Sequence, residues 1–400
     1  MHPFNQRIQS ALAARQSQGL YRSRTCLERQ DCQVLATGSL SQASSPHHAK
    51  RYLNFSSNDY LGLAQSPALV EAWQQGLMLY GAGSGASPLV TGYQPAHHRL
   101  EKQLADWLGY DRALLFSSGF GANQALLFTL LQKGDLLIQD KLNHASLMEA
   151  GMLSEATMRR FAHNDTDALA QLLAKQTNVT SAETVKMVVT EGVFSMDGDC
   201  APLSAMQTLC HAHQSLLAVD DAHGCGLLGD EGRGSCDQAG IRPDILVVTF
   251  GKAFGLQGAA ILCNEDLAEY LVQFARHYIY STAIPPAQAH ALSQACSMIQ
   301  QQHWRREKLQ ELGHILAEAL DPAVELVATD TPIKPVLVGD SQRAVAMSEQ
   351  LRDRGIWVSA IRPPTVPVNS SRLRITLTAN HEPSDIRQLA NAINEVFHAQ

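Results

Sequence analysis

A series of short apolar runs, separated by amphipathic stretches, constrains the fold of this chain more than any other feature of its sequence. The runs are rich in leucine or β-branched residues, and Gly, Asp or Ser bounds most of them, which is typical of buried strands in a parallel sheet. They are ALLF (113–116), LLI (136–138), KMVVT (186–190), LLAV (216–219), ILVVTF (245–250) and GAAIL (258–262). Strands that alternate with helices predict an α/β domain with a mainly parallel sheet flanked by helices.

The stretches between the runs carry helical patterns. HHRLEKQLADWLG (97–109) places Leu100, Leu104 and Trp107 on one face, and Gly109 follows where the helix is expected to end. A long helix is expected around 285–310, beginning after a Pro-Pro pair. Its length suits a link between a large and a small domain.

The chain divides into three expected parts. NQRIQSALAARQ (5–16) predicts a helix, which a polar segment with a Ser/Pro/His-rich loop (39–50) follows. This N-terminal helix and connecting segment occupy residues 1–51. A large domain is expected over 52–290, and a smaller C-terminal α+β domain over 291–400, where helix, strand and helix patterns recur.

Composition excludes several classes of protein. With 31 basic and 38 acidic residues the formal net charge is −7, and the basic residues form no cluster, so no nucleic-acid partner is expected. No apolar run approaches the roughly 18–20 residues that span a bilayer, and the N-terminus lacks the apolar core of a secretory signal. The spacing of the eight cysteines fits no zinc site and no disulfide framework. These features predict a soluble, cytoplasmic protein without a bound metal or a membrane partner.

Polar side chains gather where the expected strands end. Ligands of open parallel sheets bind beyond the carboxyl ends of the strands, so these side chains are candidates for a site. They are Glu191, Ser195, Asp220, His223, Thr249 and Lys252. The turn SSGFG (117–121) also follows a strand and opens a helical pattern, and such a helix N-terminus can bind a phosphate.

Each of these signals has a plain structural explanation when it stands alone. Lys252 is either a desolvated amine that forms a Schiff base or a solvated loop lysine. Asp220 is either the partner of a cationic cofactor atom or a helix N-cap, and His144 is either a site residue or an ordinary loop histidine. GAGSG (81–85) lacks the preceding strand of a dinucleotide fingerprint, and no GxxxxGK[ST] loop occurs, so nucleotide binding gains no support.

The combination of these residues, and their order along the chain, favours one cofactor. Along the chain come a glycine-rich turn, a histidine, a serine, an Asp-x-x-His sequence and a strand-end lysine. Pyridoxal 5′-phosphate (PLP) needs this set: phosphate donors, an aromatic ring over the cofactor, an aspartate that keeps the pyridine nitrogen protonated, and a lysine amine. The sequence therefore predicts a PLP enzyme.

The chain resembles the α-oxoamine synthases, a family of fold-type I PLP enzymes, over nearly its whole length. The matching segments are long and jointly specific. They are NFSSNDYLGLA (54–64), GAGSG (81–85), SSGFGANQA (117–125), LNHASLMEA (142–150), VVTEGVFSMDGDCAPL (188–203), VDDAHGCGLLGDEGRGS (219–235), TFGKAFG (249–255) and YSTAIPP (280–286).

The resemblance implies roles for the matching residues. Lys252 is the implied Schiff-base lysine, Asp220 pairs with the pyridine nitrogen, and His144 stacks on the cofactor and faces the substrate. These are the three expected catalytic residues. The other implied cofactor contacts are Ser195 and His223 on the phenolic-oxygen side, and Gly119, Phe120 and Thr249 at the phosphate.

For the substrates, the resemblance implies that Arg374 clamps the amino-acid carboxylate, a task suited to a bidentate guanidinium. Arg22 and Thr365 match positions that the family uses for the acyl substrate. A homodimer is implied in the same way.

Three further segments indicate a branch of the family. Residues 159–165, 274–288 and 360–381 most resemble enzymes that condense L-alanine with a pimeloyl thioester in biotin biosynthesis. Both acyl carrier protein and coenzyme A remain open as the carrier. The alternative is a glycine C-acetyltransferase, which uses the same cofactor with glycine and an acetyl group, and an aminotransferase on the same fold is a more distant one.

Overall fold

The computed structural model describes residues 2–18, 20–22, 24–39, 50–176 and 184–399. Its large unit is built on a seven-stranded sheet in which β10 runs antiparallel to both neighbours and the other adjacent strands are parallel. The expected α/β fold with a mainly parallel sheet is confirmed, and each predicted run forms a strand. Across the sheet the strands are β4 (Arg112–Phe116), β10 (Ala259–Cys263), β9 (Ile245–Thr249), β8 (Leu216–Asp220), β7 (Lys186–Glu191), β5 (Leu136–Asp140) and β6 (Thr157–Phe161).

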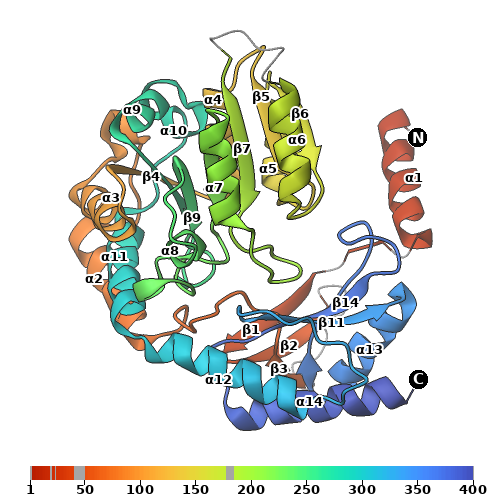
Figure 1. Ribbon diagram of the computed structural model, residues 1–400. Helices are drawn as coiled ribbons and strands as arrows, with labels where there is room; N and C mark the ends of the chain where they lie inside the picture. Colours follow the sequence, from red (N-terminus) through yellow and green to blue (C-terminus); the bar gives the residue numbers. More distant parts are fainter. Residues whose placement is uncertain (1, 19, 23, 40–49, 177–183, 400) are drawn as a thin grey trace.

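Helices cover both faces of this sheet (Figure 1). Side chains alternate between the faces along a strand, so in β9 Leu246 and Val248 enter one core while Ile245 and Val247 enter the other. The first core, which continues into the smaller unit, includes α3 (Pro95–Leu108), α6 (Thr166–Gln176), α7 (Leu203–Ala212) and α11 (Pro286–Gln301). The second includes α4 (Gly119–Leu130), α5 (Ala145–Leu153), α9 (Glu265–Phe274) and α10 (Arg276–Ile279).

Two further α-helices belong to the large unit. α2 (Pro67–Tyr80) packs along α11, and the short α8 (Ser235–Gln238) lies in the loop between β8 and β9. The predicted end of α3 is confirmed, because Gly109 adopts a left-handed φ of 78° directly after the helix. None of the described helices is both long and apolar enough to cross a membrane.

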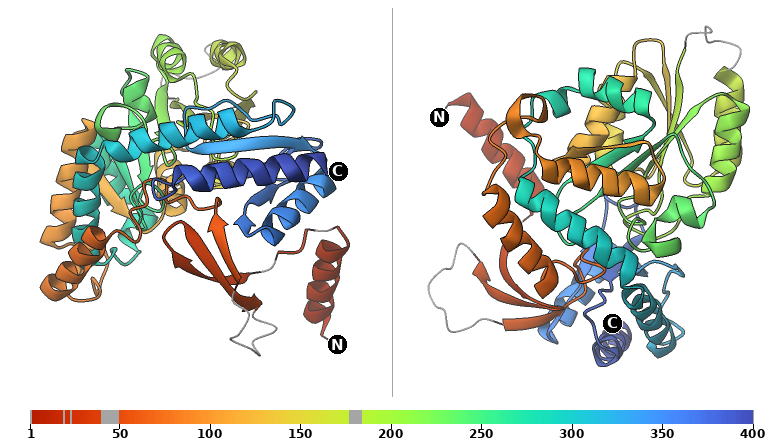
Figure 2. Two further views of the ribbon diagram at one scale, coloured as in Figure 1. Left: turned by 90° about the horizontal axis from the view of Figure 1, so that it is seen from below. Right: turned by 90° about the vertical axis from the view of Figure 1, so that its left-hand side faces the viewer.

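The smaller unit joins the C-terminal region to strands from the N-terminal region (Figure 2). One of its sheets has the order β11-β14-β13 and is antiparallel; in the other, β1-β2-β3-β12, the last strand pairs with β3 in parallel. The expected domain boundaries at residues 51 and 290 fall inside β3 and α11. The elements are β1 (Thr25–Gln30), β2 (Gln33–Ser39), β3 (Lys50–Asn54), α12 (Trp304–Ala319), β11 (Ile333–Gly339), α13 (Ser341–Asp353), β12 (Ile356–Trp357), β13 (Ser359–Ile361), β14 (Ser371–Thr376) and α14 (Pro383–His398).

One local prediction was wrong. The helix expected over 285–310 is two helices, α11 and α12, because Gln302 leaves the helical region with φ −96° and ψ 63°. The polar segment expected after the first helix, which is α1 (Pro3–Ser17), contains an antiparallel strand pair, β1 and β2, that was not predicted. Residues 40–49 of the Ser/Pro/His-rich stretch lie outside the described residues.

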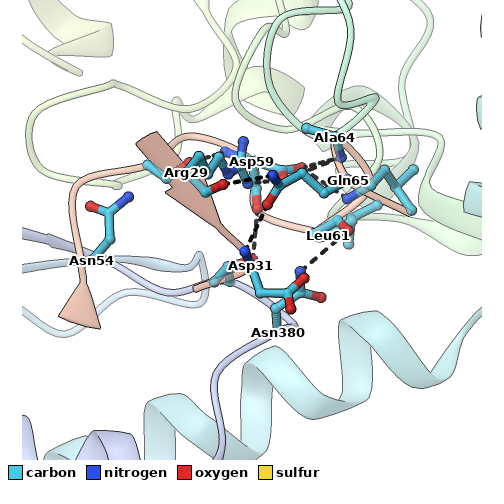
Figure 3. A network of polar contacts seen from close by, with 12 residues as sticks. Arg29, Asp31, Asn54, Asp59, Leu61, Ala64, Gln65 and Asn380 are labelled. Carbon is cyan, nitrogen blue, oxygen red and sulfur yellow. Dashed lines mark hydrogen bonds and ion pairs between the residues drawn. The ribbon is translucent and has the colours of Figure 1, made fainter. Parts of the chain in front are cut away.

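A half-buried ion pair attaches this N-terminal hairpin to the loop that follows β3 (Figure 3). The guanidinium of Arg29 contacts the carboxylate of Asp59, which also accepts hydrogen bonds from the backbone amides of Leu63 and Ala64. Because Asp59 is 5% exposed, removing its cationic partner would leave a buried charge. The hairpin therefore fixes the start of a loop whose neighbouring residues reach the candidate site.

Candidate active site

A cavity of about 250 Å³ lies where the parallel strands end. It is bounded by residues at or just after the ends of β7, β8 and β9 and by the N-terminus of α4, as expected for an open parallel sheet. Most of the predicted site residues line it together. They are Gly119, Phe120, His144, Asp220, His223, Thr249 and Lys252.

Asp220 and Lys252 supply the cavity's opposite charges. Asp220 is the last residue of β8 and is buried; its carboxylate accepts hydrogen bonds from Asn123 Nδ2 at 2.7 Å and from the Ala222 amide at 3.1 Å. Lys252 Nζ lies 3.4 Å from Thr249 Oγ1. Desolvation lowers the pKa of Lys252, although the negative charges of Asp220 and Glu191 oppose that shift. The amine is thus easier to deprotonate than an ordinary lysine, as a nucleophile requires.

A second carboxyl group lies beside Asp220. Glu191 ends β7 and is paired in register with Asp220 on β8. Its burial, with the neighbouring Asp220 charge, raises the pKa of Glu191 well above its ordinary value. The burial and the neighbouring carboxylate thus disfavour a negative charge on Glu191 next to Asp220.

His223 is held from behind by a chain of polar side chains. Its Nδ1 lies 2.7 Å from the hydroxyl of Tyr60, which is also 3.2 Å from Asn58 Oδ1. Both terminal nitrogens of Arg374 donate to the same Asn58 oxygen, each at 3.2 Å. Burial, with the positive charges of Lys252 and Arg374, lowers the pKa of His223 well below its usual range, so the ring is neutral.

The N-terminus of α4 forms another wall of the cavity. Ser118 caps the helix by accepting a hydrogen bond from the Gly121 amide at 3.1 Å, while the first amides of a helix have no intrahelical partner. Gly119 passes so close to β9 that a Cβ there would lie 2.5 Å from Thr249 Cγ2. Only glycine fits this approach, which leaves the helix N-terminus open to an anion.

Asn123 connects two of the predicted residues. Its amide nitrogen donates to Asp220 and also, at 2.9 Å, to Ser146 Oγ. That hydroxyl is 2.8 Å from Nδ1 of His144. One asparagine on α4 therefore sets the relative positions of the carboxylate and the histidine ring.

The remaining predicted residues lie outside the first cavity. Ser195 and Thr365 line a second cavity of about 330 Å³. Arg374 lies near both cavities. Its Nε donates to the carbonyl of Ser195, in the second cavity, at 2.7 Å, and its two terminal nitrogens donate to Asn58 Oδ1, in the first cavity. Arg22 is exposed, in the segment before β1, and lines neither cavity.

The sequence predicted no role for four residues that contact the predicted ones. Tyr60 and Asn58 lie within the quoted segment NFSSNDYLGLA, and Asn123 follows Gly119 by one helical turn, so the motifs contained them. Their contacts span long separations, such as 163 residues between Tyr60 and His223, and only the fold reveals them. The four are Asn58, Tyr60, Asn123 and Ser146, while Glu191 was a candidate without an assigned role.

The side chains present fit PLP. A lysine amine of lowered pKa, a buried carboxylate for the pyridine nitrogen and an open helix N-terminus for the phosphate are the groups that this cofactor requires. They surround one cavity, and Asn123 Oδ1 in its wall is buried without a partner among the described residues.

Comparisons with known proteins agree with this arrangement. The family model for aminotransferase class I and II matches residues 50–393. An 8-amino-7-oxononanoate synthase of Photobacterium profundum is 63% identical over 394 residues, which cover 98% of this chain and 97% of that protein. A solved serine palmitoyltransferase of S. paucimobilis with bound PLP–myriocin has a TM-score of 0.88 at 26% identity, covering 98% of this chain and 97% of its own. The 8-amino-7-oxononanoate synthase of Francisella tularensis has a TM-score of 0.73 at 32% identity, covering 87% of this chain and 98% of its own.

The fold and the side chains around the cavity, with these likenesses, define a PLP-dependent transferase of fold type I. The chain belongs to the aminotransferase class I and II family and, within it, to the family of the 8-amino-7-oxononanoate synthases. The branch expected from the sequence is confirmed, in preference to the glycine C-acetyltransferase alternative.

Proposed function

We propose that this chain condenses L-alanine with a pimeloyl thioester, carried on acyl carrier protein or coenzyme A. The products are 8-amino-7-oxononanoate, CO2 and the free thiol, a step of biotin biosynthesis. The observation that carries the reaction type is the pairing, in one cavity, of the Lys252 amine with the buried Asp220 carboxylate. The names of the full-length relatives support the choice of substrates.

Several side chains would hold the cofactor. Lys252 Nζ is the attachment point, and the Asp220 carboxylate keeps the pyridine nitrogen protonated. Bound PLP supplies an electron sink for negative charge at the amino-acid Cα. The phosphate would bind at Gly119, Phe120 and Thr249, and the phenolic oxygen would face His223, with Ser195 beyond it, while His144 stacks over the ring.

The amino acid is oriented by Arg374 and deprotonated by Lys252. We propose that the Arg374 fork binds the alanine carboxylate, which it can reach from its position between Asn58 and Ser195. The Lys252 Nζ, whose pKa is lowered by desolvation, would then remove the Cα proton of the bound alanine.

The acyl transfer and the loss of CO2 that follows need no oxidant or reductant besides the two substrates. The Cα electron pair forms a bond to the thioester carbon, the C–S bond breaks, and the thiolate takes a proton and leaves. The former alanine carboxylate departs as CO2, and the electron pair that it leaves is protonated at Cα by the Lys252 ammonium. The second cavity would hold the acyl chain, since Thr365 lies there with Leu142, Phe194 and Val366.

We further propose that two copies of the chain form a homodimer. α1 has no buried residue, and its apolar side chains Phe4, Ile8 and Leu12 follow one helical stripe that is 58%, 41% and 47% exposed. Met78, near the C-terminal end of α2, and Val90, in the segment before α3, are 88% and 73% exposed. A contiguous exposed apolar stripe such as that of α1 is typical of an interface. A separate proposal concerns Arg22, whose side chain we expect to contact the acyl substrate.

A cytoplasmic location is proposed on two grounds. Cys210, Cys225, Cys236, Cys263 and Cys296 are buried free thiols, as a reducing compartment allows. The relatives are bacterial enzymes of a biosynthetic reaction.

The test is a substrate panel with the purified protein loaded with PLP. Thiol release is followed with L-alanine or glycine as the amino acid, and with pimeloyl or acetyl groups on coenzyme A or acyl carrier protein. The proposal expects release only when L-alanine and a pimeloyl donor are present together. A preference for glycine with acetyl-coenzyme A would overturn the substrate assignment.

A further inference from the structure

A charged histidine joins two loops of the site. His163 follows β6, within the segment RRFAHND, and its side chain is 28% exposed. Its Nδ1 lies 3.1 Å from Asp140 Oδ1, and its Nε2 lies 2.7 Å from Asp199 Oδ2. A carboxylate only accepts hydrogen bonds, so both ring nitrogens donate and the ring is a cation.

The two carboxylates lie beside two different segments of the chain, each of which forms a wall of the second cavity. Asp140 ends β5, is fully buried, and also accepts hydrogen bonds from the backbone amides of Leu142 and Asn164, each at 2.8 Å. Asp199 closes the loop after β7, where its carbonyl accepts the Phe194 amide at 2.9 Å. The edge of the His163 ring also meets the ring of Phe194, 4.4 Å away at 90°.

Both segments line the second cavity. Lys141, Leu142 and Asn143 line it from the segment after Asp140. Residues 194–197, which precede Asp199, line it from the loop after β7. The same loop presents the Ser195 carbonyl to Arg374 and the Asp197 carboxylate to Arg372. His163 thus connects the wall that leads to His144 with the wall that orients Arg374.

We propose that His163 is a positioning residue that fixes the width of the second cavity, and with it the binding of the acyl donor, by clamping Asp140 to Asp199. The inference rests on the proposed function, because it assigns the second cavity to the acyl chain. His163 contacts neither cavity directly, so it acts through Phe194 and the two loops.

The two ion pairs of His163, with Asp140 and Asp199, form the clamp, and electrostatics favour them near neutral pH. The hydrogen bonds and charges of Asp140 and Asp199 outweigh the desolvation of the ring and raise the pKa of His163 to about 9. These two carboxylates are the charged groups that shift its titration. The clamp is therefore intact near neutral pH and opens as the pH rises through about 9.

The test compares the PLP-loaded wild type with His163→Gln, a neutral side chain that bridges the carboxylates less well. The KM for the pimeloyl thioester is expected to rise on the order of tenfold to a hundredfold, with a much smaller change in kcat and an unchanged cofactor absorbance. Asp199→Asn should raise the KM in the same direction by less. The matched control His211→Gln, on the exposed side of α7, should leave the KM unchanged.

Two readouts separate the clamp from a merely structural role. In the wild type the KM for the thioester should rise above about pH 9, and this rise should be absent in His163→Gln. Nitrogen NMR of the imidazoles should show one histidine that is protonated on both nitrogens at pH 8 and is missing from the variant. An unchanged KM in a folded, active His163→Gln protein, or no such histidine signal, would overturn the inference. If the wild type itself fails to turn over L-alanine and the thioester, the proposed function fails instead.

Discussion

Tyr60→Phe removes one hydroxyl from the centre of the site and leaves the packing of the ring in place. Tyr60 is fully buried, and burial raises the pKa of its hydroxyl to about 12, so it is protonated at neutral pH. His223 Nδ1 lies 2.7 Å from the hydroxyl, closer than Asn58 Oδ1 at 3.2 Å, so we assign the hydroxyl proton to the bond with Nδ1 and the proton of the neutral ring to Nε2. Phenylalanine therefore removes both a hydrogen bond and the group that selects this tautomer.

The expected loss of stability follows from the partners. Asn58 Oδ1 still accepts from Arg374, but His223 Nδ1 is left buried without the hydroxyl. An unsatisfied buried polar group costs about 1–3 kcal/mol. We expect a loss of free energy of unfolding in that range, and a fall in kcat because His223 can then present the wrong nitrogen to the cofactor.

The assay is urea unfolding followed by tryptophan fluorescence, beside steady-state kinetics on the PLP-loaded protein. Tyr270→Phe is the matched control, because Tyr270 is a surface residue of α9 that is 36% exposed. The control should change stability by less than about 0.5 kcal/mol. Equal stability and equal kcat for Tyr60→Phe and the control would refute the role given to the hydroxyl.

Three other substitutions test the remaining roles. Lys252→Ala should abolish both turnover and the visible absorbance of the attached cofactor; normal turnover would exclude it as the attachment point. Asp220→Asn should keep part of the PLP but lose on the order of a hundredfold in rate, because the pyridine nitrogen is no longer held protonated, and a rate near that of the wild type would contradict this. Arg374→Lys keeps the charge but loses the fork, so the KM for L-alanine should rise about tenfold or more with the cofactor absorbance unchanged. An unaltered KM would mean that another residue holds the carboxylate.

The sequence was most informative where burial and chemistry coincide. Strands such as β8 and β9 are short, continuous apolar runs, and each delivers a polar residue at its end, so Asp220 and Lys252 could be assigned to one edge of a sheet. β6 was not predicted, because two arginines interrupt its apolar pattern. The hairpin of β1 and β2 was missed for a similar reason, since its strands are polar and mostly half-buried or exposed.

Other features depend on contacts that no local pattern records. The break between α11 and α12 falls at Gln302 and His303, without glycine or proline to mark it. Asn123 is an ordinary helical residue until the fold places Asp220 and Ser146 against it. The placement of Ser195 and Thr365 in a cavity apart from Lys252 likewise follows from the path of the loop after β7.

The central claim is a condensation with loss of the alanine carboxylate, and isotope labelling tests it most directly. The PLP-loaded protein is given L-alanine labelled with ¹³C at the carboxyl group, with a pimeloyl thioester, and labelled CO2 and thiol are measured together. The account predicts equal amounts of labelled CO2 and thiol, with neither formed when either substrate is omitted. Thiol release without labelled CO2 would show simple hydrolysis of the thioester, and would contradict the condensation assigned to Lys252 and Asp220.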